Sequence, residues 1–158
     1  MSEPVLPSSL YDLPAGIVFD PAQAWTIMAQ YGHGGWLGLT YQDHGEGWLE
    51  VALPWRAELV GVAETGVLAS GPIISLMDIA TSMAVWTLAK RFVPHATLDL
   101  RVDYMRAAVP GRTVIGHGEC YKLTRTIAFI RGTAHDGDPD DPVAHVAGTF
   151  MATMGTYL

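Results

Sequence analysis

The chain has 158 residues, of which 49% are hydrophobic and only 16% are charged, and its formal net charge is −7. This composition excludes an intrinsically disordered chain, and the length fits one domain rather than several. The acidic balance excludes a domain-wide basic surface for nucleic acid. The single cysteine, Cys120, excludes an internal disulfide and predicts a reducing, cytoplasmic location. So few charges indicate either an unusually apolar surface or a surface partly covered by other subunits.

Residues 1–19 contain three prolines and no basic segment, which predicts an irregular N-terminal arm rather than a secretory signal. Asp20 and Pro21 have the residue types of a helix N-cap and first helical position. They predict a short helix over residues 21–31, which the following glycine cluster would end. One domain is expected to fill residues 20–158.

Residues 36–43 and 47–53 are strand-like on either side of a turn at 44–47, which predicts a β-hairpin. Residues 54–71 contain a proline and several glycines. They are expected to form a loop with little regular structure.

A long helix is predicted from Pro72, capped by Ser70 or Gly71, to about Arg91. Its apolar residues occupy nearly every face, which is typical of a helix buried on all sides. Its most apolar stretch, residues 73–89, is short for a membrane span and contains an aspartate, so a core helix is expected and no membrane association.

Only strand patterns follow the long helix. Residues 97–104 alternate with a period of two, and residues 113–123, 126–135 and 143–154 are further strands separated by turn signals. The acidic run over 136–142 lacks the loop and terminal glutamate of an EF-hand and predicts an exposed turn. This order predicts an α+β fold, in which one antiparallel sheet wraps around a central helix.

Asp78 is the only charged residue between Glu64 and Lys90, in the middle of the most apolar helix. Burying an unpaired carboxylate is costly. Asp78 therefore either pairs with an arginine or a backbone amide, or lines a pocket as a catalytic carboxylate. Ser82 lies four residues further along and shares its face, although its hydroxyl could simply bond back to the carbonyl four residues earlier.

Residues 66–78, 97–106 and 122–129, the last followed by 146–150, together resemble the hot-dog thioesterases of the PaaI-like, phenylacetate-pathway type. The resemblance covers roughly residues 46–154. It implies a hot-dog fold, in which the sheet wraps the helix, and hydrolysis of acyl-CoA thioesters by a homodimer or homotetramer. No cofactor is implied, because CoA is part of the substrate.

The resemblance also implies roles for particular residues. Asp78 matches the catalytic carboxylate, acting as nucleophile or general base, and the backbone amides at Ser70 and Gly71 match the oxyanion site. Ser82 and Thr97 match hydroxyl residues that hold the attacking water. Strand alternation places Thr97 on the opposite face from the next leucine, so it reaches Asp78 only if the strand start twists or bulges.

Two departures from the family pattern favour an alternative function. The usual His-Gly-Gly before the helix is replaced by a sequence beginning with Ala69, and a frequent asparagine is replaced by Ala63. The alternative is a non-catalytic acyl-CoA-binding hot-dog protein. A hot-dog hydratase is disfavoured because Met83 stands where hydratases carry a histidine.

The distance between Ser70 and Asp78 predicts that each active site is built from two chains. Ser70 and Asp78 lie roughly 12 Å apart along a helix, so one helix start would serve the partner's aspartate in a two-fold dimer. Arg106, Lys122 and Arg125 are the candidates for binding CoA phosphates, unless they are ordinary solvated charges. The six histidines show no metal-ligand spacing, so no metal is expected. A serine-hydrolase elbow is also missing around Ser70.

Overall fold

The computed structural model describes residues 19–158, so the predicted arm lies, apart from Phe19, outside the described residues. Phe19 is buried, and its ring meets Trp86 edge-on at 5.3 Å between ring centroids. The first helix, α1 (Pro21–Met28), begins as predicted. The Asp20 side chain accepts hydrogen bonds from two first-turn amides, at 2.9 and 3.3 Å.

The predicted strand over 36–43 is wrong in its first half. A second short helix, α2 (Gly32–Leu37), occupies the glycine cluster, and the strand β1 (Thr40–Gly45) starts only after it. Gly38 ends α2 in the left-handed conformation, with φ of 70°, which glycine adopts without strain. Leu37 and Leu39 are both buried, so burial of these two leucines holds α2 against the domain.

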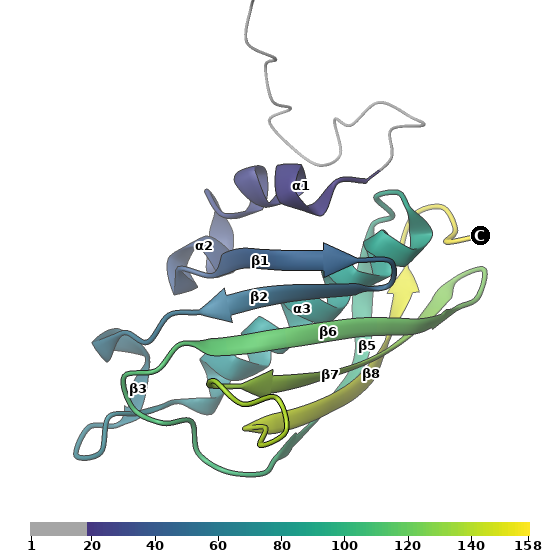
Figure 1. Cartoon of the computed structure of the whole chain (residues 1–158). Coiled ribbons are helices and arrows are strands. Elements are labelled where there is room, and N and C mark those ends of the chain that lie inside the picture. Colours follow the sequence, from purple (N-terminus) through teal and green to yellow (C-terminus); the bar gives the residue numbers. More distant parts are fainter. Residues whose placement is uncertain (1–18) are drawn as a thin grey trace, which may run out of the picture.

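The remaining strands confirm the predicted antiparallel sheet (Figure 1). Six strands pair in the order β1-β2-β6-β7-β8-β5, and every pair is antiparallel. The bounds after β1 are β2 (Trp48–Leu53), β5 (His95–Tyr104), β6 (Val114–Leu123), β7 (Ile127–His135) and β8 (Ala144–Ala152). The segment expected to be a loop is more ordered than predicted, with the 3-10 helix η2 (Ala57–Leu59) and a small hairpin of β3 (Val60–Val62) and β4 (Val67–Leu68).

The central helix, α3 (Ser70–Ala89), begins two residues before the predicted Pro72. Its N-cap is Ala69 and not Ser70 or Gly71, and no side chain caps it. The helix packs closely on the sheet because β6 carries glycines where the two meet. A Cβ on Gly118 would lie 2.5 Å from the carbonyl carbon of Ala80. Close packing of this kind fixes the depth and rotation of α3, and so the direction of its polar side chains.

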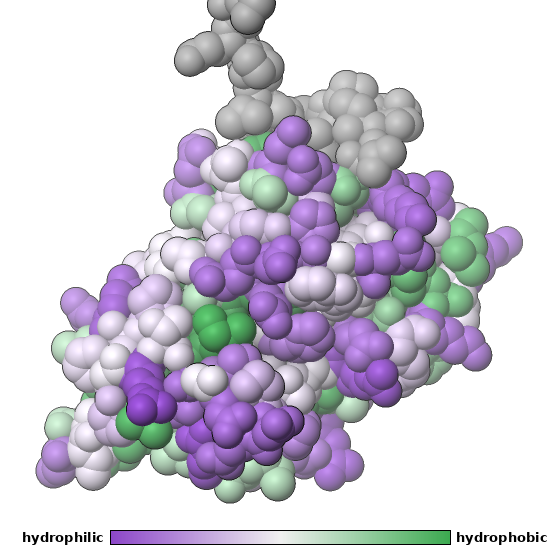
Figure 2. Space-filling view, viewed as in Figure 1, coloured by the Kyte–Doolittle hydropathy of each residue, from purple (hydrophilic) through white to green (hydrophobic). Residues whose placement is uncertain are grey.

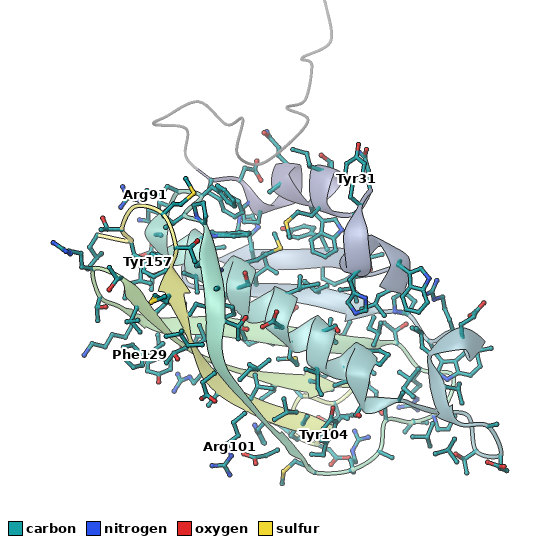
Figure 3. All side chains as sticks on the ribbon, turned by 180° about the vertical axis from the view of Figure 1, so that it is seen from behind. Tyr31, Arg91, Arg101, Tyr104, Phe129 and Tyr157 are labelled. Atoms are coloured by element: carbon teal, nitrogen blue, oxygen red, sulfur yellow. The ribbon has the colours of Figure 1, made fainter. Side chains whose placement is uncertain are left out.

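One face of α3 stays partly open, which corrects the prediction of burial on all sides. Gly71, Ser75, Asp78 and Ser82 follow at intervals of four, three and four residues, so they share one face of the helix. All four are half-buried or exposed in the single chain. We call this set the open stripe. From behind, α3 lies in front of the sheet (Figure 3).

Within residues 19–158, α3 is the one helix with the length and hydropathy of a membrane span. In the fold it is the central helix, and 56% of its most apolar window is buried inside the protein. On the sheet side of the molecule, hydrophilic and apolar residues are interspersed (Figure 2). Apolar side chains therefore reach the surface and account for part of the low charge content.

Candidate active site

Asp78 lies half-buried near the middle of α3, with its carboxylate turned towards β5. The Thr97 hydroxyl donates a hydrogen bond of 2.8 Å to Asp78 Oδ1. In the described part of the chain, Asp78 forms no ion pair and accepts no backbone amide at its carboxylate. Neither form of the structural alternative, an arginine or a backbone amide as partner, is therefore observed.

A β-bulge at the start of β5 brings Thr97 to Asp78. Thr97 pairs with Phe150 and Asp99 with Thr149, so Leu98 is an extra residue in the strand. The bulge therefore turns Thr97 towards the helix, which is the condition that strand alternation required.

Gly148 of the neighbouring strand β8 accommodates the bulge. A Cβ on Gly148 would overlap the carbonyl oxygen of Asp99. Only glycine leaves room for the bulged backbone at this point.

Ser82 is held by a histidine from β5. Its Oγ lies 2.7 Å from Nε2 of His95. The expected back-bond within the helix is instead made by the neighbouring Thr81, which donates to the Met77 carbonyl at 2.7 Å. His95 was not predicted as a site residue, because its contact with Ser82 depends on how β5 lies across α3.

His95 is enclosed by aromatic side chains. Its ring stacks on Trp86 at 5.0 Å between centroids and also contacts Phe150 and Tyr157. Burial lowers the pKa of His95 to about 4, so the imidazole is neutral at physiological pH. Its buried Nδ1 has no hydrogen-bond partner in the described region.

The start of α3 offers free backbone amides. The first amides of a helix lack intrahelical partners, and here these include Ser70 and Gly71, while Pro72 has none. The Tyr104 hydroxyl donates to the Ser70 carbonyl at 3.1 Å and braces this turn. Gly71 lies seven residues from Asp78, about 10.5 Å along the axis. Amides and carboxylate of one chain are therefore too far apart to act on the same bond.

A cavity of about 300 Å³ opens beside these amides. Apolar residues of α2, η2 and α3, with Ala69 and Gly71, form most of its wall. At one side Nε2 of His33 lies 3.0 Å from Oγ of Ser75. The contact between His33 and Ser75 was not predicted, because His33 lies in a short glycine-rich segment that was expected only to end a helix.

The three predicted CoA-binding residues do not lie together. The Arg106 guanidinium donates to both carboxylate oxygens of Asp136, at 2.7 and 2.9 Å, and lies 3.0 Å from the Asp141 carboxylate. Its hydrogen bonds hold the pKa of Asp136 at about 2. The acidic run was predicted to be an exposed turn. Its first residue, Asp136, is instead buried.

Lys122, near the end of β6, and Arg125, in the β6–β7 turn, both lie exposed near the far end of α3. This position follows from two backbone contacts of Gly47, which receives the Cys120 amide and donates to the Thr87 hydroxyl of α3. Arg106 lies near the start of α3, where it lines a small cavity with Ser70. One chain therefore presents its basic residues at opposite ends of the helix.

Residues 19–158 contain no group of three or more histidine, cysteine, aspartate or glutamate side chains arranged to hold a metal ion. The chemistry available at the open stripe comes from one carboxylate, two hydroxyls and the helix-start amides.

The chain is similar to known proteins over most of its length. The model of the thioesterase superfamily matches residues 65–143. A protein of known structure from Pseudomonas aeruginosa is 40% identical, with a TM-score of 0.70, and the match covers 77% of this chain and 90% of that one.

Two further structures extend this comparison. A mutant of the phenylacetic acid degradation protein PaaI from Thermus thermophilus is 26% identical, with a TM-score of 0.65, covering 75% of this chain and 96% of that one. A thioesterase from Haemophilus influenzae is 17% identical, with a TM-score of 0.73 and coverage of 85% and 92%, and shows a shared fold. A comparison with curated proteins finds no match.

Proposed function

Because the chain belongs to the thioesterase superfamily and has its hot-dog fold, we propose that it hydrolyses an acyl-CoA thioester to a carboxylic acid and free CoA. The observation that carries this proposal is Asp78. It is a carboxylate on the open stripe of the central helix, oriented by Thr97 and without a cationic partner among the described residues. A carboxylate kept free in this way is available as nucleophile or general base.

Two routes are open to Asp78. It attacks the thioester carbonyl to form an anhydride that water then cleaves, or it removes a proton from a water that attacks directly. In both, the carbon–sulfur bond breaks, the CoA thiolate leaves and takes up a proton, and a carboxylate is released. Thr97 donates to Oδ1, so Oδ2 would carry out the reaction, and the Ser82 hydroxyl would hold the water.

The developing oxyanion would be held by the amides of Ser70 and Gly71, where the helix dipole also favours negative charge. Since these amides and Asp78 of one chain are too far apart, the proposal places them in different subunits. Two α3 helices packed antiparallel along their open stripes would set each helix start beside the partner's Asp78.

A homodimer, or a homotetramer made of two such dimers, is therefore proposed. The strand β5 supports this arrangement, because it forms one edge of the sheet and exposes Leu98 and Tyr104, which are 53% and 43% accessible. An exposed apolar strand edge is a site for pairing with a second chain.

CoA binding is proposed for Arg106, Lys122 and Arg125. In an antiparallel pair, the partner's Lys122 and Arg125 come to the start of α3, where the thioester would be held. Arg106 is the weakest of the three candidates because Asp136 already engages its guanidinium. The cavity beside Ala69 would take the acyl group. The reaction needs no cofactor, and we place the protein in the cytoplasm.

A non-catalytic acyl-CoA-binding protein is the competing function. Ala69 lines the cavity and Ala63 lies on the β3–β4 turn, and neither side chain can donate a hydrogen bond to a thioester. In this case the amides alone would bind the carbonyl, and no hydrolysis would follow.

The experiment that separates these functions measures free-thiol release from a panel of acyl-CoAs. Wild type is compared with Asp78→Asn and with Asp99→Asn, an exposed carboxylate on the same strand as Thr97. We expect Asp78→Asn to lower kcat about 10³-fold, within the range for losing an acid–base group, and Asp99→Asn to leave it unchanged. Binding without turnover in wild type would favour the competing function, and full activity in Asp78→Asn would remove Asp78 from the mechanism.

A further inference from the structure

We propose that His95 is a positioning residue for this reaction, and that it orients the Ser82 hydroxyl towards the water or acyl group handled at Asp78. The inference rests on the proposed thioesterase function. It adds a residue that neither the sequence motifs nor the family resemblance indicated.

The first observation is the direction of the Ser82 hydrogen bond. Serine and threonine within a helix commonly bond back to a carbonyl of the preceding turn, and Thr81 and Thr87 of α3 do so. Ser82 instead bonds across to His95 at 2.7 Å. Its Oγ is therefore held by another element and not by its own helix.

The second observation assigns the protons. His95 Nδ1 is buried without a partner among the described residues. A buried N–H without an acceptor is rarer and more costly than a bare acceptor nitrogen. The proton therefore belongs on Nε2, which donates to Ser82 Oγ. The Ser82 hydroxyl keeps its own proton, which is free to donate to an oxygen at the open stripe.

The third observation is a match between two spacings. Asp78 and Ser82 are four residues apart on a helix, about 6 Å along its axis. Thr97 and His95 are two residues apart on β5, about 6.6 Å along the strand. The start of β5 therefore holds both Asp78 and Ser82, through one bond at 2.8 Å and one at 2.7 Å.

The fourth observation is the rigidity of the His95 ring. It stacks on Trp86, and the rings of Phe150 and Tyr157 contact it on other sides, at 4.8 and 6.0 Å between centroids. Trp86 is itself fixed, because its indole N–H donates to the Val93 carbonyl at 2.7 Å. A ring enclosed in this way holds its partner in one direction, as a positioning role requires.

The test compares four variants with wild type in the acyl-CoA assay. His95→Phe keeps a ring in the cluster and removes the donor, and we expect kcat to fall about tenfold with KM within twofold. His95→Gln returns an N–H donor and should recover most of this loss. Ser82→Ala should lower kcat to the same extent, and adding His95→Phe to it should lower kcat no further.

Val114→Ala is the control for stability, because it removes buried apolar volume from β6 and leaves His95, its aromatic neighbours and Ser82 intact. It should lower the unfolding temperature and leave kcat unchanged. Nitrogen-detected NMR of the His95 ring gives a readout apart from activity. Its proton should be found on Nε2, and the Nε2 shift should move in Ser82→Ala.

Several results would overturn the inference. These are an unchanged kcat in His95→Phe, a loss that follows stability and that glutamine does not restore, independent effects in the double variant, or a proton found on Nδ1. If Asp78→Asn is inactive while His95→Phe is fully active, the positioning role fails and the proposed function stands. If wild type hydrolyses no acyl-CoA, the proposed function fails and the positioning role fails with it.

Discussion

Asp78 and Asp136 are two aspartates that the fold treats in opposite ways. Asp136 is buried at the β7–β8 turn, accepts two hydrogen bonds from Arg106, and takes a third from the Val109 amide at 2.7 Å. Asp78 is half-buried and, within residues 19–158, its carboxylate accepts a single hydrogen bond, from the Thr97 hydroxyl.

The difference separates structural from chemical use of the same side chain. A buried carboxylate with both oxygens held by an arginine, and one of them also by an amide, stabilises the fold and is not available to a substrate. A carboxylate fixed by one neutral donor keeps an oxygen free. If the two regions are divided in this way, substitutions at Asp136 change stability and substitutions around Asp78 change activity.

The largest effect on stability is expected at Asp136. Replacing it as Asp136→Asn removes the charge that binds Arg106 and should lower the free energy of unfolding by about 3 kcal/mol, as for breaking a buried ion pair. Urea denaturation measures this loss. The kcat of the folded Asp136→Asn protein should be unchanged. Asp78→Asn should instead lower kcat and leave the free energy of unfolding unchanged. If kcat of Asp136→Asn falls at urea concentrations too low to unfold the variant, Asp136 is not purely structural.

Acid should affect the two regions at different pH. Burial holds the pKa of His95 at about 4, below its ordinary 6.5, so the unfolded chain takes up this proton first. Stability is then lost as pH falls from about 6.5 towards 4, by about 2 kcal/mol at pH 5. The pKa of Asp136 is depressed to about 2 from 3.8, so its contribution is lost only below pH 3.8. Denaturation curves from pH 7 to 2 measure both windows.

The control for the acid window is His95→Phe, which removes the titrating group. Its stability should be flatter between pH 6.5 and 4 than that of wild type. An equal slope in the two proteins would mean that another group takes up the proton.

A smaller effect is expected at Thr97. Thr97→Val keeps the shape and removes the donor to Asp78, so kcat/KM should fall about tenfold, as for loss of one hydrogen bond to a charged group. Gly148→Ala should cause a similar loss without touching Thr97, because a Cβ there would displace the bulge. Thr113→Val, in an exposed loop, is the control. Full activity in both site variants would show that Asp78 needs no orientation.

The hydrophobic periodicity of the sequence and the position of its charges were enough to predict the sheet and to single out Asp78. The strands after α3 follow a period of two, and Asp78 is conspicuous as the only charge in a long apolar stretch. The helix α2 was missed because glycine disfavours helices in general, and here the burial of Leu37 and Leu39 overrides that tendency.

The contacts that complete the site were not predictable in the same way. The Leu98 bulge depends on Gly148, which lies on another strand and 50 residues further along the sequence. The bond between Ser82 and His95 depends on how β5 crosses α3. Strand patterns locate elements along the chain, but such contacts are set by how the elements pack against each other.

The smallest effect is expected from the basic residues. It tests whether the Asp136 region is separate from substrate binding. Lys122→Gln combined with Arg125→Gln should raise KM about threefold with kcat unchanged, and the effect should shrink as salt screens the phosphates. Arg106→Gln should mainly lower stability and raise KM less than the double variant does, because Asp136 already holds the guanidinium. If Arg106→Gln raises KM as much as the double variant does, then Arg106 serves both the fold and the substrate. The Asp136 region would then belong to the active site. A buried carboxylate paired with an arginine could then no longer be taken as purely structural.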